Sequence, residues 1–82
     1  MKILLVEDDA DMSKALARAL DKRGFQVTTC ADGAQAFRQI REETNDLVIL
    51  DLNIPSLDGL HILQRTRALS IGVPVILLTA RG

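Results

Sequence analysis

The sequence lacks the features that mark membrane, secreted or nucleic-acid-binding proteins. Its apolar runs span only about four residues, whereas a membrane-spanning helix needs about 20. The net charge of −1 provides no basic field that would attract nucleic acid or an anionic membrane. The first residues do not follow the basic, apolar and small-residue layout of a signal peptide. We therefore expect a cytoplasmic protein that contacts neither a membrane nor, through this segment, nucleic acid.

Cysteine is also scarce. Cys30 is the only cysteine, so an internal disulfide is excluded, which suits a reducing compartment. We expect a small, buried or half-buried side chain there rather than a reactive thiol. The remaining composition, 48% hydrophobic and 26% charged over 82 residues, is that of one small globular domain.

Short apolar runs alternate with segments of helical period. Continuous runs over 2–6, 46–50 and 75–78 predict strands covered on both faces, the last of them an interior strand. The alternation over 25–30 predicts a strand exposed on one side or at a sheet edge. A helix is expected over 11–22, and two more are expected after Asp32 and after Asp58. The side chains expected to face inward or to share one helix face are Met12, Ala15, Leu16, Ala19, Leu20, Phe25, Ala36, Phe37, Ile40, Leu60, Leu63 and Arg67.

Helix-capping residues punctuate this alternation. Asp9 or Asp11 can cap the first helix, and Gly24 stands where a left-handed residue ends it. Asp32 with Gln35 resembles a capping box, and Asp58 is a candidate N-cap for the third helix. Helices of this length between strands predict right-handed βαβ units and a parallel sheet.

Acidic residues follow two of the buried runs directly. Glu7, Asp8 and Asp9 follow the first strand, and Asp51 follows the third. Parallel sheets bind ligands beyond the carboxyl ends of their strands, at the point where the strand order reverses. Carboxylates gathered there repel one another unless a cation neutralises them, and an all-oxygen site favours Mg²⁺. A central carboxylate could then bind metal only, or attack a phosphoryl group and form an acyl phosphate.

Three segments carry a family resemblance: I-L-L-V-E-D-D at 3–9, L-V-I-L-D-L-N-I-P-S-L-D-G at 47–59 and P-V-I-L-L-T-A at 74–80. Their residues and spacing resemble the receiver domain of bacterial two-component response regulators. The resemblance implies a flavodoxin-like, doubly wound α/β fold with a parallel sheet in the strand order 2-1-3-4. The motif around Asp51 is most similar to regulators that carry a C-terminal winged-helix DNA-binding domain and control transcription.

The resemblance also implies roles for individual residues. Asp51 matches the phosphoacceptor, which takes a phosphoryl group from a sensor histidine kinase. Asp8 matches a direct Mg²⁺ ligand, and Glu7 matches an acid that acts through water. The position of Asn53 implies a backbone carbonyl ligand to the metal. The remaining matches are Thr79 as the hydroxyl that contacts the phosphoryl group, Ala80 as its small neighbour, Pro55 and Gly59 in the loop, and Arg81 as a residue that tunes phosphoryl lifetime.

Measured against this family, 1–82 is expected to be an incomplete receiver domain. It would comprise three βα units and a fourth strand, without the fourth helix, fifth strand and fifth helix. We accordingly expect weak stability or self-association, because an apolar fourth strand would lack one neighbour. The resemblance implies a signalling domain rather than an enzyme acting on a separate substrate.

Other interpretations stay open at this point. A stand-alone receiver without a DNA-binding domain fits the same residues. A Mg²⁺-dependent phosphatase with an aspartyl nucleophile is less consistent, because Asn53 stands where that chemistry usually places a second acid. A flavin or nucleotide binder would need a glycine-rich first loop, whereas this loop is acidic. Asp9 and Asp58 are interpreted as helix caps, and His61 as a solvated residue without a role.

Overall fold

The computed structural model describes residues 1–52, 54 and 58–78, and within them the expected alternation is present. The elements are β1 (Lys2–Val6), α1 (Ala10–Lys22), β2 (Gln26–Cys30), α2 (Gly33–Arg41), β3 (Leu47–Asp51), α3 (Gly59–Ala68) and β4 (Val75–Leu78). Among these residues, no helix is both long enough and apolar enough to span a bilayer.

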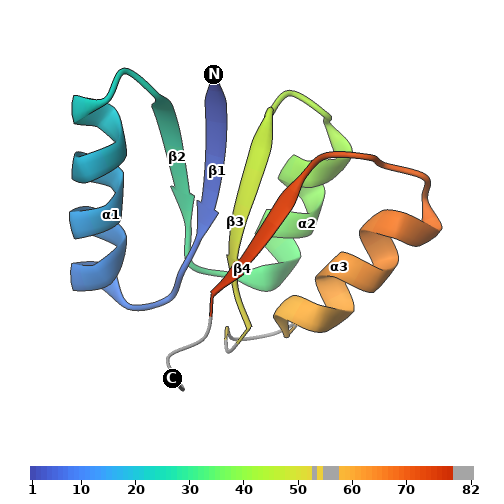
Figure 1. The fold of residues 1–82 in the computed structure, drawn as a ribbon. Helices are drawn as coiled ribbons and strands as arrows, with labels where there is room; N and C mark the ends of the chain where they lie inside the picture. Colours follow the sequence, from blue (N-terminus) through green and yellow to red (C-terminus); the bar gives the residue numbers. More distant parts are fainter. Residues whose placement is uncertain (53, 55–57, 79–82) are drawn as a thin grey trace.

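The strands form one parallel sheet in the order β2-β1-β3-β4. The chain moves from β1 to β2 in one direction and then returns past β1 to β3. Since parallel crossovers are right-handed, this reversal places α1 on one face of the sheet and α2 with α3 on the other (Figure 1). The predicted flavodoxin-like, doubly wound fold is confirmed.

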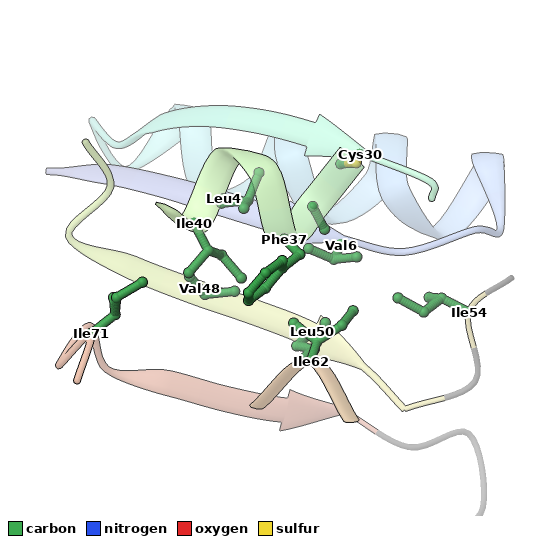
Figure 2. Close-up of a cluster of buried hydrophobic side chains, with 11 residues drawn as sticks. Leu4, Val6, Cys30, Phe37, Ile40, Val48, Leu50, Ile54, Ile62 and Ile71 are labelled. Atoms are coloured by element: carbon green, nitrogen blue, oxygen red, sulfur yellow. The ribbon is translucent and has the colours of Figure 1, made fainter. Parts of the chain in front are cut away.

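The main hydrophobic core lies between the sheet and the helices α2 and α3. Phe37 and Ile40 of α2 and Ile62 of α3 point into it, over Leu4 and Val48 of the sheet (Figure 2). The whole cluster is Leu4, Val6, Cys30, Ala36, Phe37, Ile40, Val48, Leu50, Ile54, Ile62 and Ile71. Cys30 is buried, as expected, and its thiol lies 3.2 Å from the carbonyl oxygen of Asp32.

The predicted apolar face of α1 is present, but it is only partly covered. Among the described residues of α1 none is buried; Leu16 and Leu20 are half-buried, while Met12, Ala15 and Ala19 are exposed. The apolar face exists, but the sheet covers only the part that points toward β1 and β2. Phe25 is likewise half-buried rather than fully in the core.

In α3 the residues noted at helical spacing are not the ones that the sheet buries. Leu60 is 52% exposed, whereas Ile62 and Thr66 are completely buried. Thr66 can be buried because its hydroxyl donates to the carbonyl oxygen of Ile62 at 2.8 Å, which satisfies its polar group. The helix is turned so that Gly59, Ile62 and Thr66 face the sheet. Hydrophobic spacing alone could not identify a glycine and a threonine as the buried positions.

The prediction that β4 is a buried interior strand is not met within the described residues. Of those, only β3 pairs with β4, so β4 stands at an edge of the sheet. Ile76 and Leu77 are 49% and 40% exposed. The apolar sequence of β4 is therefore typical of a covered strand, whereas in the described part of the fold only one of its edges is paired and each of its faces carries an exposed side chain.

The capping predictions were largely correct. The Asp9 side chain accepts hydrogen bonds from the backbone amides of Asp11 and Met12, which decides between the two candidate caps of α1. The Asp58 side chain accepts from the amide of His61 at the start of α3. At the other end of α1, Gly24 has φ of +92°, the left-handed conformation that glycine adopts without a Cβ penalty. Local sequence was sufficient for these positions.

Candidate phosphoacceptor and metal site

The acidic residues gather where the strand order reverses. Val6, the last residue of β1, lies opposite Leu50 in the register of the β1–β3 pair. Glu7 and Asp8 therefore follow β1 at the same level as Asp51, the last residue of β3. This edge lies at the opposite end of the sheet from the N-terminus (Figure 1). Because β1 and β3 are neighbours, the three acids are brought to one crevice.

The side chains of Glu7, Asp8 and Asp51 are close enough to share one cation. Each offers a carboxylate oxygen, and these oxygens all lie within 4.8 Å of one another. Glu7 and Asp51 are buried at 8% exposure each, while Asp8 is exposed. Two carboxylates with little access to water and a third at the rim form an oxygen donor set of the kind that Mg²⁺ prefers.

Burial raises the pKa of Glu7 above its usual range, because removal from water disfavours the charged form. The Asp9 backbone amide donates to Glu7 Oε2 at 3.1 Å and lowers the pKa in part. The side chains of Asp51 and Asp8 raise it again through hydrogen bonding, and Asp51 also through its negative charge. Without a cation, Glu7 therefore takes up a proton more readily than an ordinary glutamate does, as expected of carboxylates held this close.

Strand pairing holds the carboxyl end of β3 firmly. Asp51 is paired with Leu78 in the register of β3 and β4. The next residue, Leu52, donates its amide to the carbonyl oxygen of Leu78 at 3.1 Å. Glu7 is held in a similar way, since its amide donates to the carbonyl oxygen of Cys30 at 2.9 Å. Backbone bonds on both strands therefore position the carboxylates.

A cavity of about 390 Å³ adjoins the acids between the ends of β1 and β2. Glu7, Asp8 and Cys30 line it together with Ser13 and Lys14 of α1. Sequence reasoning missed Ser13 and Lys14 as neighbours of the acids. The signal was present, since a helix that begins at Ala10 brings its first turn beside the loop that carries Asp8.

Several residues that the resemblance assigned to the site lie outside the described part of the chain. They are Asn53, Pro55, Thr79, Ala80 and Arg81. Their assigned roles stay predictions. Of the described site residues, Glu7, Asp8 and Asp51 come together as expected, while Asp9 serves as a helix cap.

Comparison with known proteins agrees with the fold. Residues 3–82 match the family model of the response regulator receiver domain. The transcriptional regulatory protein PrrA of Mycobacterium tuberculosis is 42% identical over 81 residues, which are 99% of this chain and 35% of PrrA. The chain thus spans about a third of the length of this curated relative.

Solved receiver domains have the same fold. The receiver domain of the Francisella response regulator 1452 superposes with a TM-score of 0.93 at 30% identity, covering 98% of this chain and 66% of that one. The receiver domain of the sensor histidine kinase PA1611 from Pseudomonas aeruginosa, solved with a magnesium ion coordinated in its active-site cleft, has a TM-score of 0.91 at 38% identity. This match covers 98% of the present chain and 67% of PA1611's.

The fold and the acidic crevice define a receiver-type signalling domain. The chain belongs to the response regulator receiver domain family. Receiver domains of response regulators act together with histidine kinases in two-component systems, and this chain's relatives are transcriptional regulators. Family membership favours this interpretation over the phosphatase and the flavin binder that the sequence had left open.

Proposed function

We propose that this chain is a phosphoacceptor module and that Asp51 accepts the phosphoryl group. The observation that carries the proposal is the position of the Asp51 carboxylate. It is 8% exposed, stands at the end of a central strand, and has oxygens of Glu7 and Asp8 within 4.8 Å. Such a costly gathering of carboxylates in one crevice is typical of a functional site rather than of helix caps.

Mg²⁺ is the cation that best fits these donors. Glu7, Asp8 and Asp51 would hold it together with the backbone carbonyl of Asn53, and the donors are all oxygen. The raised pKa of Glu7, which arises mainly from burial and in part from Asp51 and Asp8, supports this assignment, because a nearby cation would favour the charged carboxylate. When bound, the metal supplies positive charge that offsets the charge on the oxygens of a transferring phosphoryl group.

In the proposed reaction one oxygen of the Asp51 carboxylate attacks phosphorus. A new P–O bond forms while the P–N bond of a phosphohistidine breaks, and the imidazole leaves with the bonding electrons and takes up a proton. The carboxylate oxygen of Asp51 is the nucleophile, so it must face phosphorus without an intervening group. We assign the hydroxyl of Thr79 to contact the transferred group and Ala80 to leave space for it.

The proposed partner is a sensor histidine kinase in the cytoplasm. Control of transcription would reside in a DNA-binding domain elsewhere in the parent protein, as the regulators among the relatives suggest. This segment itself would not bind DNA, and its only reactions would be its own phosphorylation and dephosphorylation. Whether the receiver continues through a fourth helix and a fifth strand stays a prediction. The codons that follow Gly82 in the parent gene test it.

Phosphorylation tests the proposal directly. The protein is incubated with acetyl phosphate and MgCl₂, and intact mass is measured over time. We expect one added phosphoryl group on the wild type and none on Asp51→Asn. Asp21→Asn is the matched control, since Asp21 is an exposed carboxylate in the last turns of α1. Uptake of the phosphoryl group by Asp51→Asn would contradict the assignment.

A further inference from the structure

Helix α3 begins in unusually close contact with the backbone of the acceptor strand. A Cβ atom at Gly59, the first residue of α3, would lie 2.5 Å from the carbonyl oxygen of Asp51. It would also lie 2.8 Å from the Cα of Leu52 and 3.1 Å from the carbonyl carbon of Asp51. These are backbone atoms, so no flexible side chain could move aside. Only glycine fits here without displacing the end of β3 or the start of α3.

Neither side of this contact is free to yield. On the α3 side, Ile62 and Thr66 are completely buried against the sheet, and moving the helix outward would expose them. On the strand side, the Leu52 amide is bonded to the carbonyl oxygen of Leu78. The Gly59 amide itself donates to the carbonyl oxygen of Leu52 at 3.2 Å. Helix and strand are thus joined at the peptide that follows the acceptor.

We propose that Gly59 is a positioning residue for the Asp51 carboxylate. The carbonyl that Gly59 contacts and the carboxylate share the same Cα, so a shift of the peptide turns the side chain. The proposal rests on the function proposed for Asp51 and adds the element that sets its orientation. Metal coordination and in-line attack both depend on placement within fractions of an ångström.

Gly59→Ala tests the proposal, with two other glycines as controls. A Cβ at Gly72 would meet no described atom within 4 Å, so Gly72→Ala should leave the protein unchanged. Gly24→Ala also meets no described atom within 4 Å, but it is strained at φ +92°, so it should lower stability without touching the site. If Gly24→Ala loses as much stability as Gly59→Ala and shows the same effect, that effect reflects lost stability and not a change at the site.

Two properties are compared at temperatures where each variant is folded. For Gly59→Ala we expect Mg²⁺ affinity by calorimetry and the rate of phosphorylation by acetyl phosphate to fall about 10-fold to 100-fold. We also expect a changed ¹³C chemical shift of the Asp51 carboxylate in the metal-free protein. Both controls should retain wild-type values. Wild-type affinity, rate and chemical shift in folded Gly59→Ala would overturn the proposal.

The ¹³C chemical shift of the Asp51 carboxylate distinguishes a failure of this proposal from a failure of the proposed function. If the wild type takes up no phosphoryl group, the function fails, while a shift confined to Gly59→Ala still supports the positioning role. If Gly59→Ala does not fold, hydrogen exchange in the wild type decides. Adding Mg²⁺ with beryllofluoride should slow exchange of the Gly59 amide about 10-fold and leave the Ser70 amide, bonded to Arg67 at the far end of α3, unchanged. Equal exchange at Gly59 with and without these ligands would refute the role.

Discussion

The two faces of the sheet are covered to different extents, most clearly at β3. On the face of α2 and α3, Leu4, Val48 and Leu50 are completely buried beneath Phe37 and Ile62. On the face of α1, coverage decreases from the centre of the sheet toward its edge. Leu5 of β1 is completely buried, its partner Ile49 in β3 is half-buried, and Ile76 of β4 is 49% exposed.

The difference shows what hydrophobic periodicity encodes. It identifies the side chains that share a face, and both faces of the sheet are apolar. It does not report how much of each face a helix covers, because that depends on where the helix lies over the sheet. Within the described residues α1 lies mainly over β2 and β1, and at β4 both faces are exposed, through Ile76 on the α1 face and Leu77 on the other.

The largest expected effect is a difference in stability between side-chain truncations on the two faces of the sheet. Ile62→Ala removes a completely buried side chain, so we expect a loss of about 2–5 kcal/mol in the free energy of unfolding. Met12→Ala on α1, whose side chain is 50% exposed, should change stability by no more than about 0.5 kcal/mol. Urea denaturation followed by circular dichroism measures both. Equal losses would mean that the α1 face is also a packed core.

A second prediction concerns the acidic residues at the carboxyl ends of β1 and β3, between the two faces of the sheet. If Glu7, Asp8 and Asp51 hold Mg²⁺, a concentration of 100 times the dissociation constant should stabilise the folded chain by about 2.7 kcal/mol. The thermal midpoint should rise with MgCl₂ in the wild type and much less in Asp8→Asn. KCl at matched ionic strength is the control for screening. An equal rise with KCl would contradict a specific site.

The N-caps provide a finer comparison, because α1 and α2 have the same local cap but different packing. Asp9 accepts from the amides of Asp11 and Met12, and Asp32 accepts from those of Ala34 and Gln35. Replacing either by alanine should cost about 1 kcal/mol. Hydrogen exchange should then reveal fraying of α1 in Asp9→Ala, while the buried Phe37 and Ile40 hold α2 in place in Asp32→Ala. Equal protection of the two helices would argue against this difference.

The smallest expected effect is a pH dependence of the free energy of unfolding that arises at Glu7, the residue directly after β1. Its pKa is raised in the folded state, so the folded protein binds this proton more tightly than the unfolded chain does. In metal-free protein its contribution to stability is therefore greatest below the usual pKa of glutamate and is lost as pH rises through the raised value. Glu7→Gln should lack this decline. Thermal midpoints measured across this pH range in EDTA check it, and a decline of the same size in Glu7→Gln would contradict the assignment.

Local sequence was enough to predict most elements and the acidic crevice. The runs 3–6 and 47–50 are apolar over their whole length, as strands inside a parallel sheet must be, and acids follow each. Strand order then brings Glu7 and Asp8 to Asp51 without any further information. The caps Asp9, Asp32 and Asp58 were predictable because each acts within three residues of itself.

Contacts between distant segments decided the features that sequence analysis missed. Phe37 of α2 lies beneath the guanidinium of Arg65 of α3, whose Cζ is 4.5 Å from the ring centroid. Lys14 and Ser13 line the cavity beside the acids because α1 begins immediately after them. No periodicity within one helix reports what the neighbouring helix or loop presents to it.

The sequence by itself determined where the strands and helices form, which residues cap them, and that acids collect at one edge of the sheet. Those properties follow from backbone preferences and hydrophobic period, which act over a few residues. Only the tertiary structure decided which side of α3 is buried, how far α1 covers the sheet, and why residue 59 must be glycine. These depend on atoms that are distant in the chain and close in space, such as the carbonyl oxygen of Asp51 beneath the start of α3.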